Sequence, residues 1–195
     1  MPLSDDVAQI TLDDLHQLVA DGEQEGVRLE LKGDKPTKER LERGICAFAN
    51  TSGGHFVIGV KGDEHTNQAI EVCGVAADRG LPEQLAQWLK EIRPRVNPAQ
   101  SPLIDVGNGK VACVFYQPPS TLAPHMVSDW RYYMRAGATN TPMPEEMVSR
   151  YYLARQVGDR AALDVLNRDI SCDCVKFRRQ VWPGRSSGQG LPPIC

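Results

Sequence analysis

The sequence lacks any apolar run long enough to cross a membrane, and it lacks an excess of positive charge. No stretch approaches the roughly 18 consecutive apolar residues that a transmembrane helix needs. The formal net charge of the 195 residues is −3, which excludes a globally basic nucleic-acid binder but leaves room for a local basic surface. The acidic start, Met-Pro-Leu-Ser-Asp-Asp, carries no secretory h-region. We therefore expect a cytoplasmic protein with no membrane partner.

Cysteine is present, but in no pattern that defines a site. The six cysteines are residues 46, 73, 113, 172, 174 and 195. The first three lie in apolar segments, which is typical of reduced and buried thiols. Cys172 and Cys174 form a CxC pair without a histidine nearby, whereas a zinc site needs four ligands at suitable spacing. The cysteines therefore predict neither a disulfide framework nor a zinc centre.

The apolar patterning predicts an α+β fold. Hydrophobic residues make up 41% of the chain, which is enough for a real core. Helical and strand periods alternate, with helices expected at about residues 11–20, 37–49, 81–92 and 144–157, and strands at 27–32, 55–60, 69–74, 103–106, 110–117 and 131–135. Gly107-Asn108-Gly109 is typical of a hairpin turn. We expect a mixed, largely antiparallel sheet with hairpins, packed by several helices.

The chain is expected to hold one domain with a short lead-in and a tail. Residues 1–20 should form an N-terminal helix and lead-in, residues 21–157 the domain, and residues 158–195 a short helix (159–167) followed by a flexible basic tail. The inward-facing apolar side chains should share one core: Leu41, Ile45, Phe48, Val57, Ile58, Leu85, Trp88 and Phe115.

The residues that could catalyse a reaction or bind a ligand lie in motifs spaced along the chain. Glu25 precedes Glu30-Leu31-Lys32, and strand alternation places Glu30 and Lys32 on the face opposite the core. A helix then ends in Asn50-Thr51-Ser52-Gly53-Gly54 and an apolar strand begins at once. Tyr132-Tyr133-Met134-Arg135-Ala136-Gly137 lies downstream. Clustered carboxylates are suitable ligands for Mg²⁺ or Mn²⁺, although a solvated charge cluster on a strand edge is the alternative.

This spaced set resembles the Schlafen AlbA_2 domain, a nucleic-acid-linked α+β domain, over about residues 20–150. In nuclease members of the wider Schlafen group, two glutamates and a later aspartate form a metal-assisted triad that cleaves RNA. The resemblance implies that Glu25, Glu30 and Asp63 are the catalytic and metal-binding residues here, with Mg²⁺ or Mn²⁺ activating water. The family pattern places this aspartate just after the Ile-Gly-Val of the central strand. Here Ile58-Gly59-Val60 is followed by Lys61-Gly62, so Asp63 stands one residue late. The alternative role of Asp63 is that of a turn former.

Basic and aromatic residues around these motifs are candidates for nucleic-acid contacts. We expect Lys32, Lys38, Arg40, Arg131 and Arg135 to bind the phosphate backbone, and Tyr133 or its neighbour Tyr132 to stack on a base. Because acidic residues are interleaved with them, solvated surface charge is the alternative. The 50–54 loop is either an anion-binding nest or a structural connection; it lacks a Walker lysine, which disfavours ATP binding. His55 fits a structural role better than a ligand role.

Together these observations favour a nucleic-acid-binding domain of Schlafen AlbA_2 type, with metal-dependent cleavage of structured RNA as a further expectation and RNA favoured over DNA. A single lobe of this kind offers an open face, so we also expect a homodimer with Met147, Tyr151 and Tyr152 at its interface. The alternative is a non-catalytic regulatory module that binds DNA or a protein partner.

Overall fold

The computed structural model describes residues 3–158. The chain divides into two units, Met1–Tyr152 and Leu153–Cys195, and the first of these holds the sheets and the helices α1 to α3. The predicted helix at 159–167, the Cys172 and Cys174 pair and the basic tail lie outside the described residues. Among those residues, none of the helices has the length and apolar character needed to span a bilayer.

The fold is α+β, as predicted. Its elements are η1 (Val7–Gln9), α1 (Leu12–Ala20), β1 (Leu29–Lys32), α2 (Lys38–Ala49), β2 (Gly54–Ile58), β3 (Val60–Gly62), β4 (Ala69–Val72), β5 (Val75–Ala76), α3 (Leu81–Leu89), β6 (Ala99–Gln100), β7 (Ile104–Gly107), β8 (Lys110–Gln117), β9 (Tyr133–Ala136) and β10 (Thr139–Pro142). A further helix starts at residue 145. Thr11 and Thr37 cap α1 and α2 with their side chains, as helix-start chemistry favours.

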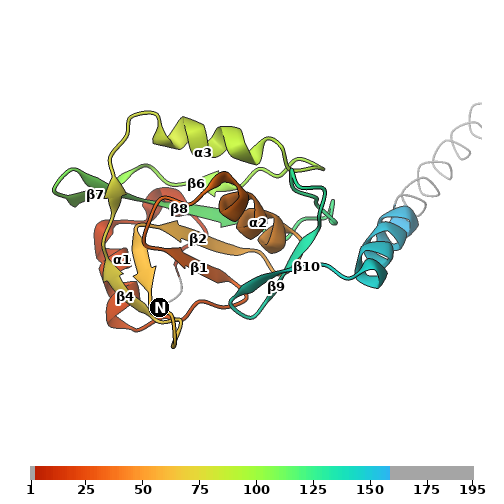
Figure 1. The fold of residues 1–195 in the computed structure, drawn as a ribbon, viewed down its shortest axis with the longest axis horizontal. Helices are drawn as coiled ribbons and strands as arrows, with labels where there is room; N and C mark the ends of the chain where they lie inside the picture. Colours follow the sequence, from red (N-terminus) through yellow and green to blue (C-terminus); the bar gives the residue numbers. More distant parts are fainter. Residues whose placement is uncertain (1–2, 159–195) are drawn as a thin grey trace, which may run out of the picture. The chain divides into compact units, whose positions relative to one another are not determined.

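One mixed sheet forms the centre of the domain (Figure 1). Strand β8 pairs with β2 and with the short strands β5, β6 and β7, and all of these pairs are antiparallel. The parallel pair of this sheet is β1 with β2, in which Glu30 lies opposite Phe56 and Lys32 opposite Ile58. Two hairpins, β3–β4 and β9–β10, stand outside this sheet. The predicted hairpin at Gly107-Asn108-Gly109 is confirmed as β7–β8.

The predicted strand 55–60 is interrupted at Gly59, which separates β2 from β3. Gly59 has a φ of +95°, and a Cβ there would lie 3.0 Å from the Cβ of Ala112. Only glycine suits both the angle and the space. The break redirects the chain into β3, so the β3–β4 hairpin leaves the main sheet, and Asp63 lies between the two strands of this hairpin.

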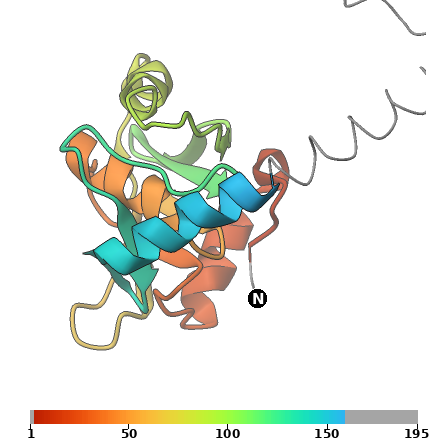
Figure 2. The same ribbon diagram turned by 90° about the vertical axis from the view of Figure 1, so that its right-hand side faces the viewer.

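The single predicted core is in fact two clusters, one on each face of the sheet. Most of the predicted residues lie in the cluster beneath α2 and α3: Leu41, Ile45, Phe48, Ile58, Leu85 and Phe115, with Trp88 half-buried against it. Val57 belongs instead to the cluster with Leu15 and Leu18 of α1. Successive strand residues point to opposite faces, so Val57 and Ile58 cannot share a cluster. Helix α1 lies apart from α2 and α3 in both ribbon views (Figures 1 and 2).

The loop after α2 is a structural connection that fixes the helix against distant segments. Asn50 is 1% exposed, and its amide donates to the carbonyls of His125 and Tyr133 at 2.9 Å while its oxygen accepts the His125 N–H. A Cβ at Gly53 would lie 2.7 Å from the Gln117 carbonyl oxygen. The N–H groups of Thr51 and Gly53 both donate to the Phe48 carbonyl. These N–H groups are therefore not available for an anion nest.

Candidate nucleic-acid interface

Two of the sequence motifs meet in a buried ion pair. Nη1 of Arg135, on β9, lies 2.8 Å from Oε2 of Glu30, on β1, although the residues are 105 positions apart. The Arg135 guanidinium also donates to the carbonyls of Gly26 and Leu29 and to the Asn140 side chain, so each of its N–H groups has an acceptor. Arg135 is 4% exposed. It holds the β9–β10 hairpin against β1.

This placement corrects the prediction that Arg135 binds a phosphate. A guanidinium with five N–H donors that are all engaged inside the protein has none left for a ligand. Burial lowers the pKa of Arg135, while the nearby Glu30 and Glu25 carboxylates act in the opposite direction. The charge is compensated internally, and the residue acts as a structural clamp.

Helix α2 packs directly over Glu30 because residue 44 has no side chain. A Cβ at Gly44 would lie 2.7 Å from the Phe56 ring and 2.9 Å from Oε2 of Glu30. Glycine inside a helix costs about 1 kcal/mol of stability relative to alanine. The close packing explains why glycine nevertheless occupies position 44. Glu30 is 4% exposed, and Asn140 donates a second hydrogen bond of 2.9 Å to the same oxygen.

Lys32 lies between the two predicted catalytic glutamates. Its Nζ is 3.1 Å from Oε1 of Glu30 and 3.7 Å from Oε1 of Glu25. The Oε1 of Glu25 also accepts the Leu31 N–H at 2.5 Å. The ammonium group thus forms ion pairs with both carboxylates, of which Glu30 is also paired with Arg135, and Lys32 is half-buried rather than extended into solvent.

Asp63 is engaged in the β3–β4 turn. Its Oδ1 accepts hydrogen bonds from the N–H groups of His65 and Thr66 and from the Thr66 hydroxyl. The Thr66 and His65 N–H bonds lower the pKa of Asp63. Glu25 and Asp63 do line one shallow cavity of about 340 Å³. The side-chain bonds show the turn-forming alternative that the sequence left open.

The three acids do not fit a divalent metal ion as they are placed. In residues 3–158, no three histidine, cysteine, aspartate or glutamate side chains gather closely enough to hold a metal. Glu30 is committed to Arg135 and Asn140, and the space beside Glu25 holds the Lys32 ammonium. The prediction that Glu25, Glu30 and Asp63 converge within reach of one metal ion is therefore wrong for this conformation. Their role in cleavage stays a prediction.

Of the other predicted contact residues, two are engaged within the protein. Tyr133 is 4% exposed, and its hydroxyl donates to Asp129 at 2.9 Å, so stacking on a base is excluded in this conformation. Lys38 forms ion pairs with Glu91 at 3.0 Å and Glu42 at 3.7 Å. Arg131 is exposed.

The exposed basic residues of α2 face the β9–β10 hairpin across a cleft. This open cleft has a volume of about 440 Å³ and is lined by Glu30, Lys32, Arg40, Arg43, Ala138, Thr139 and Asn140. The hairpin lies beside α2 and the end of β1 (Figure 1), because Arg135 and Asn140 fasten it to Glu30. We call this feature the basic cleft. It combines the cations of Lys32, Arg40 and Arg43 with the Glu30 carboxylate, to which the Asn140 amide donates.

Arg43, one of the basic residues of the predicted helix at 37–49, and Asn140, which was not among the predicted contacts, complete the cleft. Arg40 and Arg43 are three residues apart on α2, a spacing that places them on one helix face and was the available signal. Arg43 pairs with Asp129 at 3.0 Å and remains 41% exposed at its side chain. No ion pair involves the exposed Arg40 within the described residues. No sequence pattern indicates the role of Asn140, because its partner Glu30 is 110 positions away.

His55 has the structural role that the sequence favoured. Its Nε2 lies 3.0 Å from the Ser4 carbonyl oxygen and 3.8 Å from an Asp5 carboxylate oxygen, and its ring contacts Tyr116. Burial lowers the pKa of His55, against the opposing effect of the Ser4 carbonyl. The ring fixes the N-terminal segment on the sheet.

Residues 25–144 match the family model described as Schlafen, AlbA_2. The chain belongs to this family. The motifs that suggested the resemblance lie within residues 25–144, so the recognition from sequence is confirmed. Glu30 and Arg135, which belong to two of the motifs, form the clamp of this AlbA_2 domain.

Two solved structures are similar to this AlbA_2 chain. The N-terminal domain of an ATP-dependent DNA helicase RecG-related protein from Nitrosomonas europaea is 23% identical, with a TM-score of 0.43, and the match covers 57% of this chain and 74% of that one. The DIP2311 protein from Corynebacterium diphtheriae is 16% identical, with a TM-score of 0.47, and the match covers 74% of this chain but 28% of that one. These likenesses concern the fold alone. No curated protein matches the chain.

Proposed function

We propose that this AlbA_2 domain binds the phosphate backbone of nucleic acid in the basic cleft. The observation that supports the proposal is the exposed Arg40 beside Arg43 and Lys32 in one open cleft. The protein as a whole carries a net charge of −3, so attraction of a polyanion depends on such a local cluster.

The same arrangement favours binding without metal-dependent cleavage. Lys32 and Arg135 together form ion pairs with the two glutamates that the resemblance assigns to catalysis, and Asp63 accepts hydrogen bonds within its turn. A non-catalytic nucleic-acid-binding module, which was the alternative at the level of sequence, is therefore the better-supported function. We retain RNA as the favoured ligand over DNA, on the strength of the resemblance to Schlafen-type RNase lobes.

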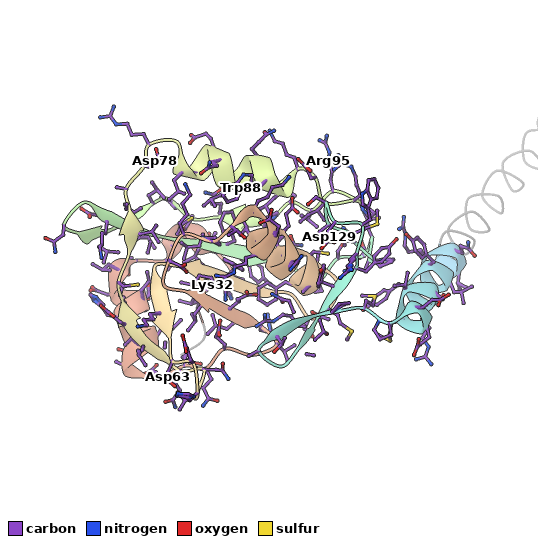
Figure 3. The ribbon with its side chains drawn as sticks, in the orientation of Figure 1. Lys32, Asp63, Asp78, Trp88, Arg95 and Asp129 are labelled. Atoms are coloured by element: carbon purple, nitrogen blue, oxygen red, sulfur yellow. The ribbon has the colours of Figure 1, made fainter. Side chains whose placement is uncertain are left out.

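The test is a titration of fluorescently labelled RNA and DNA oligonucleotides of the same sequence at several salt concentrations. Each lost phosphate contact should reduce the slope of log K against log salt by about 0.7–0.9. Arg40→Ala should weaken binding to all sequences and reduce the slope by about one contact. Arg79→Ala is the matched control, because Arg79 is exposed and does not line the cleft, and its neighbour Asp78 lies apart from Lys32 in Figure 3. Equal affinities of Arg40→Ala and wild type at low salt would overturn the proposal.

The same mixtures, incubated with Mn²⁺ and resolved on a denaturing gel, test cleavage. The expected result is bound but intact RNA. Mn²⁺-dependent fragments that disappear in Glu25→Gln would restore the nuclease prediction, since that variant removes a charge from the carboxylate pair.

We further propose that the domain functions as a homodimer. Tyr151 is half-buried and its hydroxyl donates to the Asn50 carbonyl at 2.5 Å, whereas Tyr152 remains 42% exposed. Of the three predicted interface residues, Tyr152 is therefore the one best placed for a partner. Light scattering at tens of micromolar protein, with and without RNA, tests the dimer, and a monomeric mass under both conditions contradicts it.

A further inference from the structure

Trp130 is the most exposed large apolar side chain among the described residues, at 79%. Its backbone has a φ of +63°, a region that bulky residues rarely adopt and that glycine or asparagine occupies without difficulty. Neither burial nor backbone preference explains a tryptophan at this position. Outliers of this kind cluster at functional sites, where the surrounding structure enforces them.

The turn that carries Trp130 is fastened to the protein on both sides. Within the turn, the Trp130 N–H donates to the Val127 carbonyl, and the Val127 N–H donates to the Arg131 carbonyl, both at 3.0 Å. Ser128 donates to Glu42 of α2, and Asp129 accepts from Arg43 of α2 and from the Tyr133 hydroxyl. The exposed indole thus projects from a turn that is held in place by hydrogen bonds.

The turn that carries Trp130 is joined to the basic cleft through Asp129. Arg43, which lines the cleft, contacts Asp129, the residue before Trp130. Arg131, the residue after it, is exposed. Figure 3 shows Asp129 beside the end of α2, on the same side of the domain as that helix. A flat aromatic surface flanked by arginines suits a nucleotide whose phosphate binds a guanidinium while its base stacks on the ring.

We propose that Trp130 is a stacking platform for an unpaired nucleobase at the edge of the basic cleft, so that the domain selects single-stranded or looped segments over duplex. The inference rests on the proposed function, because the cleft supplies the backbone contacts. Paired bases are already stacked on their neighbours and cannot cover the indole. Trp130 thus takes the role that the sequence had assigned to the buried Tyr133.

The first experiment compares the affinities of wild type, Trp130→Ala and Leu122→Ala for a single-stranded oligonucleotide and for a blunt duplex of the same length. Leu122 is a matched control, since it is also an exposed apolar residue, at 50%. One lost stacked base should weaken single-strand binding roughly 5- to 100-fold. Duplex binding, and both affinities of Leu122→Ala, should stay within about twofold of wild type, well below that stacking effect.

Several outcomes separate this inference from the proposed function. If Trp130→Ala matches wild type on single strands while Arg40→Ala is weaker on both ligands, the stacking platform is overturned and the cleft remains. If wild type binds neither ligand, both proposals are overturned. If Trp130→Ala leaves affinity unchanged but dissociates a dimer in light scattering, the indole serves a protein contact and the inference is overturned.

A second experiment measures the fluorescence of the Trp130 indole directly, so it does not depend on the stability of Trp130→Ala. Trp88→Phe combined with Trp182→Phe leaves Trp130 as the sole tryptophan of the three in the chain. Single-stranded oligonucleotide should quench its fluorescence, whereas an abasic oligonucleotide of equal charge should not. Equal quenching by both would show that the base does not reach the ring, and would overturn the proposal.

Discussion

Replacing Arg135 by alanine should destabilise the domain strongly, because the residue belongs to the interior. The substitution removes every hydrogen bond of the guanidinium and leaves Glu30, 4% exposed, without its closest counter-charge. Removing one partner of a buried ion pair typically costs about 3–5 kcal/mol. Total stabilities of domains lie at about 5–15 kcal/mol, so the loss is a large fraction of the whole.

The magnitude can be measured by chemical and thermal unfolding. For a domain of this size, each kcal/mol shifts Tm by about 2–4 °C, so Arg135→Ala should lower Tm by roughly 6–20 °C. Arg131→Ala is the matched control from the same segment. Arg131 is exposed, and such surface changes usually stay within about 0.5 kcal/mol.

The outcome distinguishes two assignments of Arg135. If the residue bound phosphate from an exposed position, as the sequence suggested, the two variants would have nearly equal stabilities and Arg135→Ala would lose nucleic-acid affinity alone. A loss below about 1 kcal/mol, the level of an ordinary single hydrogen bond, would refute the clamp. The double variant with Glu30→Gln then isolates the pair: the second substitution should add little, because the partners are coupled.

Three further predictions concern stability. Phe48→Ala should cost about 3–5 kcal/mol, since Phe48 is fully buried; Ile70→Ala, at a residue 47% exposed, is the control, and an unchanged denaturation midpoint for Phe48→Ala would contradict the core assignment. Burial lowers the pKa of His55, so stability should be full above the unfolded pKa of about 6.5 and fall as pH drops below it, and His55→Gln should flatten that dependence in pH-series unfolding. Mn²⁺ should leave the Tm of wild type unchanged but raise that of Lys32→Ala, in which the Glu25 and Glu30 carboxylates lack their ammonium; a clear Mn²⁺ effect on wild type would show that the metal displaces Lys32.

Local patterns made the secondary structure accessible from sequence. Alternation predicted β1, and the i, i+4, i+7 spacing of Leu41, Ile45 and Phe48 predicted the buried face of α2. The glycine-asparagine-glycine turn predicted the β7–β8 hairpin. These signals lie within a few residues of the element that they specify, so a single sequence contains them.

The sequence could not show which charged residues belong to the buried clamp and which line the cleft, because this depends on contacts between distant positions. Nothing near Arg135 shows that its partner is Glu30, 105 positions away, and an arginine after two tyrosines fits a surface site equally well. The exposure of Trp130 likewise depends on Asp129 meeting Arg43, 86 positions earlier. The sequence favoured Tyr133 for stacking, and only the fold shows that this side chain is buried.

The family motifs and the proposed ligand contacts are therefore different residues with linked roles. Glu30 and Arg135 fasten the β9–β10 hairpin to β1, and Asn140, on that hairpin, completes the wall of the cleft opposite Arg40 and Arg43. Paired charges within the clamp cancel, so they add little to the field outside. The cations that a polyanion can reach are those that the clamp leaves exposed on α2. A substitution in the clamp should thus weaken binding by loosening the hairpin, whereas one at Arg40 should weaken it with the fold intact.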